Sequence, residues 1–184
     1  MIAGPDEADT LLHTMESLLG TYPRMEIVIV DDGSTDEMSE IAQRYAREHS
    51  SVLALRKPHR GGKSSALNFA LPFTRAEIVV CVDGDSRVSP TAVWEVVQPF
   101  ADPEVGAVSA TVVARNPFDR LVTWLQALEY RRNIFLGRMF AERLGILGII
   151  SGAFGAYRRD AIQRLHGSFR DGFVPAHVRQ TTWH

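Results

Sequence analysis

The stretch EIVIVDDGSTD, residues 26–36, decides the fold. Its first half is a β-branched apolar run, which is typical of a β-strand. The run stops at Asp31 and Asp32, and Ser34 followed by Glu37 fits a capping box, which indicates that a helix begins here. The stretch therefore predicts a strand that passes through an acidic turn into a helix.

The same order of elements recurs along the chain. The spacing of apolar residues predicts helices over 7–19, 34–45, 64–70, 117–144 and 159–165, with a further helix that opens at Ser89-Pro90. Apolar or β-branched runs predict strands over 1–3, 26–30, 52–56, 77–82, 105–114 and 146–157. Strands that alternate with helices predict an α/β sandwich with a largely parallel sheet, in which ligands lie outside the carboxyl ends of the strands.

Composition and charge limit the function classes. The 184 residues are enough for one compact domain, and a net charge of −2 gives no reason to expect nucleic-acid binding. Cys81 is the single cysteine, which excludes an internal disulfide and a cysteine zinc cluster. The longest apolar stretch, 144–157, is shorter than the roughly 18 residues of a membrane span. Asp6, Glu7 and Asp9 come too early for a signal peptide, so the chain is expected to be soluble.

Two carboxylates, Asp83 and Asp85, follow the predicted strand over 77–82. A hard cation such as Mg²⁺ or Mn²⁺ takes oxygen ligands and often shares one or two carboxylates with substrate phosphates. Alternate strand positions face the same side, so both carboxylates could reach such a cation. The alternative is a polar turn that closes the strand, because Asp-Gly and Gly-Asp are common turn pairs.

Two other strand ends also carry polar groups. Asp31 and Asp32 could accept hydrogen bonds from a base or a ribose, whereas helix capping and turn formation are the better interpretation of Ser34 and Asp36. Gly61-Gly62-Lys63 stands before a helix, an arrangement that suits an anion; the alternative is a helix start with a solvated lysine. We expect these segments to converge on one edge of the sheet.

In combination, the segments resemble the family 2 glycosyltransferases, which have the GT-A fold. The matching segments are, in chain order, GPDE (4–7, for the family's AYNE), VDDGSTD (30–36), GGKSSALN (61–68, for GGK-x-x-ALN) and DGD (83–85, for DxD). Residues 125–130 and 150–158 resemble the processive members, which make poly-N-acetylglucosamine, hyaluronan, chitin or cellulose. The resemblance covers residues 2–167.

The resemblance implies a GT-A, Rossmann-like α/β/α sandwich that transfers a sugar from a UDP-sugar to an acceptor hydroxyl with inversion, in the synthesis of a polysaccharide or cell-envelope glycan. It implies that Asp31 and Asp32 bind the uracil and ribose side and that Lys63 contacts the nucleotide region. Asp83 would contact the ribose or the metal, and Asp85 would bind the Mg²⁺ or Mn²⁺ ion that bridges the diphosphate.

The resemblance also concerns the carbohydrate acceptor. Ser151 and Gly152 would line the acceptor side. An inverting transfer needs a general base, which in the family is the aspartate of an ED pair, followed in processive members by QxxRW. Neither element is found in this chain. We therefore expect residues 1–184 to form a single incomplete domain, with a clipped first strand and a poorly matching tail over 168–184.

Two other functions stay open. A nucleotidyltransferase has a similar architecture but would carry a glycine-rich signature where GPDE (4–7) stands. A non-catalytic UDP-sugar-binding remnant is compatible with the missing base. The full-length protein is expected to be cytoplasmic, at the inner face of the membrane, and to reach that membrane only through segments outside this chain.

Overall fold

A computed structural model describes residues 1–110, 125, 153–164 and 179–183, and the structural statements below refer to these residues. The helix expected over 117–144 and the first part of the strand expected over 146–157 lie outside the described residues. None of the described helices is long and apolar enough to cross a membrane.

The described strands and helices follow the predicted alternation. The strands are β1 (Ile2–Gly4), β2 (Ile27–Asp31), β3 (Val52–Arg56), β4 (Ile78–Val82), β5 (Val105–Ala110), β6 (Phe154–Arg158) and β7 (Arg179–Trp183). The α-helices are α1 (Ala8–Leu18), α2 (Met38–Glu48), α3 (Lys63–Ala70), α4 (Ala92–Val97) and α7 (Arg159–Arg164), with 3₁₀ turns η1 (Leu71–Phe73) and η2 (Gln98–Ala101). The tail over 168–184 therefore contributes a strand that the sequence did not suggest.

These strands form one sheet in the order β3-β2-β1-β4-β6-β5-β7. The pairs β1–β2, β1–β4, β2–β3 and β5–β7 are parallel, while β6 runs antiparallel to both β4 and β5. The antiparallel strand means that the start of β6, rather than its end, lies beside the end of β4: Phe154 is opposite Val82. The expectation of an α/β sandwich with a largely parallel sheet is confirmed.

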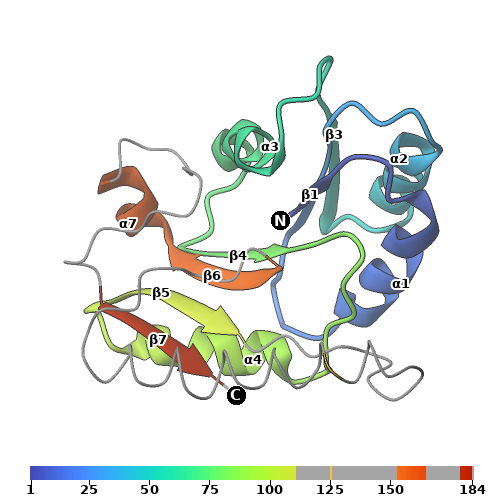
Figure 1. Cartoon of the computed structure of the whole chain (residues 1–184). Helices are drawn as coiled ribbons and strands as arrows, with labels where there is room; N and C mark the ends of the chain where they lie inside the picture. Colours follow the sequence, from blue (N-terminus) through green and yellow to red (C-terminus); the bar gives the residue numbers. More distant parts are fainter. Residues whose placement is uncertain (111–124, 126–152, 165–178, 184) are drawn as a thin grey trace.

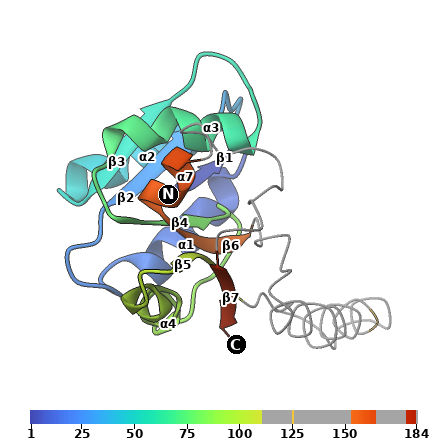
Figure 2. The same cartoon turned by 90° about the vertical axis from the view of Figure 1, so that its left-hand side faces the viewer.

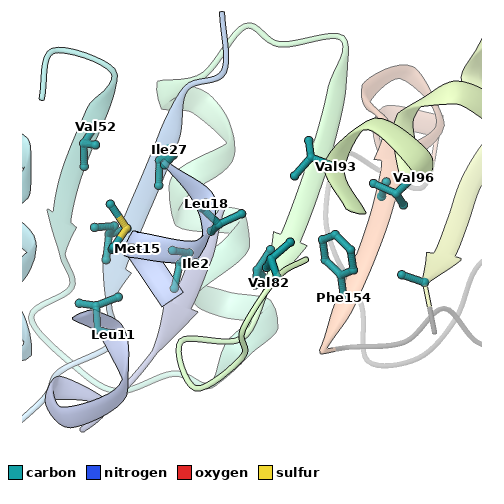
Figure 3. Close-up of a cluster of buried hydrophobic side chains, with 14 of the residues drawn as sticks. Ile2, Leu11, Met15, Leu18, Ile27, Val52, Val82, Val93, Val96 and Phe154 are labelled. Carbon is teal, nitrogen blue, oxygen red and sulfur yellow. The ribbon is translucent and has the colours of Figure 1, made fainter. Parts of the chain in front are cut away.

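Helices cover both faces of the twisted sheet (Figures 1 and 2). Alternate side chains of β2 show the two layers: Ile27 and Ile29 pack with α1, α2 and α4 in one core, whereas Val28 and Val30 pack with α3 and α7 in the other. Figure 3 shows the first core, in which Ile2, Leu11 and Met15 are fully buried. Each fully buried side chain of this size contributes about 1.5–3 kcal/mol by leaving water. Burial on both faces therefore stabilises the sheet, whose edge carries the polar segments.

The capping box expected at Ser34 and Glu37 is not formed. Ser34 Oγ instead accepts the backbone N–H of Asp6 at 3.0 Å. Asp36 takes the capping role: its Oδ1 accepts the N–H of Met38 at 3.1 Å, and its Oδ2 accepts the N–H of Ala8 at 2.9 Å. Because α1 and α2 both follow parallel strands, their first turns meet at one edge, and a single carboxylate caps both.

Arg158 fixes β6 between its neighbours. Its guanidinium donates to the carbonyl oxygens of Phe100 at 2.7 Å, Asp102 at 3.1 Å and Val105 at 3.1 Å, and also pairs with Glu77. Only 14% of the Arg158 side chain is exposed, so its buried charge is satisfied by these carbonyls and by Glu77. The contact holds the antiparallel strand against β4 and β5, and so determines what lies next to the end of β4.

Candidate functional site

Three polar segments meet at the carboxyl edge of the sheet, as expected. Asp32, at the end of β2, accepts hydrogen bonds from the backbone of Gly61 and Gly62 in the loop between β3 and α3. Lys63, the first residue of α3, forms a short ion pair with Asp83 at the end of β4. These contacts join the acidic pair, the glycine loop and the DxD segment into one cluster.

The two carboxylate oxygens of Asp31 differ in their contacts: one accepts a backbone hydrogen bond, and the other accepts none within the described residues. Its Oδ1 accepts the N–H of Ser34 at 2.7 Å, which closes the turn after β2. Its Oδ2 lies 3.4 Å from Nε of Arg56, whose side chain is half exposed, and accepts no hydrogen bond within the part of the chain that the structure describes. The residue is 1% exposed, so this oxygen is a buried acceptor that is only partly compensated.

Asp32 is enclosed by donors. Gly62 N–H donates to its Oδ2 at 2.6 Å, Gly61 N–H donates to both oxygens at 3.0–3.1 Å, and the Lys57 ammonium donates to Oδ1. Burial alone would raise the pKa of Asp32, but the hydrogen bonds from Lys57 and the two glycines hold it below its ordinary value. The anion that the glycine pair binds in this structure is therefore the protein's own carboxylate.

Lys63 lies in a cluster of carboxylates. Besides Asp83, it experiences the charges of Glu7 and Asp85. Burial is the main influence and lowers the pKa of Lys63, while the two carboxylates oppose that effect. An ammonium that is partly desolvated among carboxylates would gain from the arrival of a diphosphate, because the added negative charge favours its protonated form.

Glu7 fills the space between two glycines. A Cβ atom on Gly4 would lie 2.8 Å from the Glu7 carboxyl carbon, and one on Gly84 would lie 3.0 Å from it. Its Oε2 is buried without a hydrogen-bond partner among the described residues. Burial, and next the nearby charge of Asp85, raise the pKa of Glu7. A side chain at Gly84 would therefore displace the end of the Glu7 side chain, which reaches the turn from the β1–α1 segment.

The DxD turn is held from both sides. Thr14 of α1, which is 1% exposed, donates its hydroxyl to the carbonyl of Gly84 at 2.8 Å. On the other side, the N–H of Asp83 donates to the carbonyl of Ala153 at 3.1 Å, immediately before β6. The expected acceptor-side residues Ser151 and Gly152 lie outside the described residues. Asp85 itself is exposed.

The donor set fits a cation that the substrate helps to hold. Within the described residues, no group of three or more His, Cys, Asp and Glu side chains is placed to bind a metal ion. Asp83 and Asp85 therefore offer two carboxylates at a turn that Thr14 and Ala153 fix in place. Mg²⁺ and similar ions commonly take one or two carboxylates and complete their coordination with phosphate oxygens and water. The residues present suit such an ion and do not form an all-protein cage.

Sequence reasoning missed the contributions of Lys57, Asp6 and Arg60 to this edge. Lys57, in the loop that follows β3, is buried and paired with Asp32. Asp6 pairs with Arg60 and accepts the N–H of Thr35 at 2.7 Å, which ties three loops together. For Lys57 a signal exists: of the 20 lysine and arginine residues, only Lys57 and Lys63 are lysines.

A cavity of about 470 Å³ lies elsewhere, at the opposite edge of the sheet. It is lined mainly by apolar side chains that precede or begin the strands and by the end of α1, among them Met1, Leu18, Ile27 and Ile78. None of Asp31, Asp32, Lys63, Asp83 or Asp85 lines it. The polar cluster, rather than this cavity, is therefore the candidate site.

Comparison with known proteins agrees with this geometry. Residues 6–165, most of the chain, match the sequence model of Glycosyl transferase family 2. The chain belongs to this family. Poly-beta-1,6-N-acetyl-D-glucosamine synthase of Staphylococcus epidermidis is 28% identical over 165 residues, covering 89% of this glycosyltransferase chain and 40% of that protein. Hyaluronan synthase of Streptococcus pyogenes is 33% identical over 163 residues, covering 85% of this chain and 39% of that protein.

Solved structures confirm the fold. The mannosyltransferase PcManGT from Pyrobaculum calidifontis, in complex with GDP-Man and Mn²⁺, has a TM-score of 0.73 and 28% identity, covering 99% of this chain and 53% of that one. S. aureus TarS in complex with UDP-GlcNAc has a TM-score of 0.66; at 17% identity it shows the fold alone. The GT-A assignment is confirmed. The glycosyltransferase chain spans about 40% of the length of the curated relatives it matches.

Proposed function

We propose that this chain binds a UDP-sugar together with Mg²⁺ or Mn²⁺ and transfers the sugar to a carbohydrate hydroxyl with inversion, in the synthesis of a polysaccharide or cell-envelope glycan. One observation carries the proposal: the acidic pair after β2, the glycine loop before α3 and the DxD segment after β4 are joined by direct contacts at one sheet edge. A nucleotide, its diphosphate and a cation need these three kinds of group together.

In this proposal, Asp31 and Asp32 bind the nucleoside part of the donor. Asp31 has a buried Oδ2 that accepts no hydrogen bond from the described residues, so a base or ribose donor would satisfy it. Asp32 is committed to the glycine loop in the structure. In this proposal, Asp31 makes the more direct contact and Asp32 shapes the wall beside it.

Lys63 and the DxD segment (83–85) bind the diphosphate and its cation in this proposal. The Lys63 ammonium would exchange part of its contact with Asp83 for the diphosphate, and Asp83 and Asp85 would hold the cation. When bound, that cation supplies a Lewis acid that neutralises charge on the departing diphosphate. The lysine adds a fixed positive charge to the same region, where partial burial strengthens its effect.

The comparisons support the donor and polymer classes in this proposal. The relatives named above are synthases of N-acetylglucosamine or hyaluronan polymers, and the solved structures hold nucleotide sugars. We propose Ser151 and Gly152 for the acceptor side and leave the general base unassigned. A cytoplasmic location at the inner face of a membrane is part of the same proposal and rests on the resemblance to processive synthases.

Calorimetric titration of the chain with UDP-GlcNAc, UDP-glucose and GDP-mannose, with and without Mn²⁺, tests the donor site. We expect Mn²⁺-dependent binding of a UDP-sugar, and Asp85→Asn should abolish the Mn²⁺ dependence. Glu40→Gln removes one negative charge from an exposed position on α2 and serves as the matched control. A coupled assay for released UDP, with oligosaccharide acceptors present, then tests transfer.

Each outcome has a distinct meaning. Binding with release of UDP to an acceptor supports the full proposal. Binding without turnover supports the donor site and selects the alternative of a UDP-sugar-binding remnant for this chain. Preference for GDP-mannose would replace the UDP assignment. Absence of binding for all three donors, from a protein whose near-UV circular dichroism shows a folded core, would refute the proposed function.

A further inference from the structure

Lys57 is buried within an otherwise exposed segment. It is 8% exposed, whereas its neighbours Arg56 and Pro58 are exposed. Lysine is almost never fully buried unless its charge is paired, because an unpaired ammonium loses its hydration in a protein interior without compensation. The position therefore requires a partner, and the partner identifies what the lysine does.

The partners of Lys57 form a closed network. Its ammonium donates to Asp32 and, at 2.9 Å, to Ser65 Oγ in the first turn of α3. Asp32 is fully buried and accepts the N–H groups of Gly61 and Gly62. The network thus connects the end of β2, the end of β3 and the beginning of α3 through one buried charge.

The network determines where Lys63 stands. Gly62, with φ of +80°, immediately precedes Lys63 and the start of α3, and its N–H is the shortest backbone contact to Asp32 at 2.6 Å. If the Lys57 charge were removed, Asp32 would keep a buried negative charge with only two backbone donors. The turn that aims Lys63 at Asp83 would then lose its cation.

The geometry also indicates why this cation is a lysine. A Cβ atom on Gly61 would lie 2.6 Å from Nζ of Lys57 and 2.9 Å from Cβ of Ser65, so the ammonium occupies a tight space beside the glycine. A planar guanidinium is wider than an ammonium and cannot take the same place without moving the loop. Elsewhere the chain uses arginine: 18 of its 20 lysine and arginine residues are arginines.

We propose that Lys57 is a positioning residue for the donor diphosphate: through Asp32 and the Gly61-Gly62 turn it sets the position of Lys63. The inference rests on the proposed function, because the diphosphate is the group that Lys63 would meet. Lys57 itself touches no substrate in this proposal, since its ammonium is enclosed by Asp32 and Ser65.

Two variants separate charge from geometry. Lys57→Met removes the ammonium at nearly constant length, and Lys57→Arg keeps the charge but enlarges the head. Arg47→Met, at an exposed position of α2, is the control for loss of one positive charge. Both Lys57 variants are expected to weaken UDP binding by about tenfold or more, a size typical of losing a partner that orients a ligand-binding group. Uridine affinity should change little, because uridine lacks the diphosphate.

Amide hydrogen exchange of the unliganded protein gives a readout that needs no nucleotide. We expect faster exchange at Gly61 and Gly62 in both Lys57 variants and no change in Arg47→Met. Unchanged exchange at the two glycines would overturn the inference, and so would faster exchange with an unchanged ratio of UDP to uridine affinity. If the wild-type chain binds no nucleotide at all, the proposed function fails and the positioning role fails with it; if it does bind, unaffected Lys57 variants refute the positioning role alone.

Discussion

Gly84→Ala tests how the DxD turn is built. The new methyl group would lie 3.0 Å from Cδ and 3.5 Å from Cβ of Glu7, and closer still to Oε2. Gly84 is not among the residues with positive φ, so the backbone itself tolerates alanine. Overpacking at such a contact costs about 1–3 kcal/mol, and restriction of the unfolded chain returns about 0.4–1 kcal/mol. A net loss of stability follows, and Glu7 is its cause.

The double variant Glu7→Ala/Gly84→Ala isolates that cause. Glu7→Ala removes the two atoms nearest to the methyl group and leaves Cβ at 3.5 Å, an ordinary van der Waals contact, so the double variant should be at least as stable as Glu7→Ala alone. Urea unfolding of the four proteins, with transition midpoints and slopes compared, gives a coupling free energy that we expect to be about 1–3 kcal/mol. Gly4→Ala should behave in the same way, because its Cβ would lie 2.8 Å from Glu7 Cδ. If the stability losses of the two single variants add to that of the double variant within about 0.5 kcal/mol, the proposed contact between Glu7 and the methyl group at position 84 is refuted.

Three further predictions concern the same framework. The folded-state pKa of Glu7 is raised above its ordinary 4.5, so the protonated carboxyl stabilises the fold below that pH, and this contribution is lost as pH rises through the raised value. The stability of Glu7→Gln relative to wild type, measured by urea unfolding, should therefore increase above pH 4.5. A stability difference that does not change with pH would contradict this. Arg158→Met leaves the carbonyls of Phe100, Asp102 and Val105 without their charged donor and should cost about 3 kcal/mol or more of unfolding free energy. A loss below about 1 kcal/mol would show that these hydrogen bonds from Arg158 are dispensable. Asp36→Ala removes the caps of α1 and α2 together and should cost about 1–2 kcal/mol, whereas Asp36→Asn keeps one acceptor oxygen, and therefore one of the two caps, and should cost less; equal losses in the two variants would argue against the shared cap.

Much of the fold could be predicted because local pattern and burial agree. The alternation in β2, where Ile29 and Val30 face different cores, made the strand and its end visible in the sequence. The convergence of Asp32, Gly61 and Asp83 followed from a general property of parallel sheets. These inferences needed only the order of the elements, which residue periodicity specifies.

The rest depends on contacts between segments far apart in the chain. Ser34 fits a capping box locally, but the N–H of Asp6 takes its hydroxyl, and Asp36 caps instead. The direction of β6 is not encoded in its own residues, since it follows from the strands on either side. The buried pair of Lys57 and Asp32 spans 25 positions, and no spacing rule connects them.

The distribution of lysines has a practical consequence for handling the protein. Both ε-amino groups of the chain lie within seven residues of each other at the candidate site, and every other basic side chain apart from histidine is a guanidinium. Amine-directed dyes, biotin esters and sensor-chip coupling will therefore react with Lys57, Lys63 or the N-terminal amine, and a preparation attached through Lys63 would lose the ammonium that the proposed function assigns to the diphosphate. Attachment through an added C-terminal tag avoids the artefact.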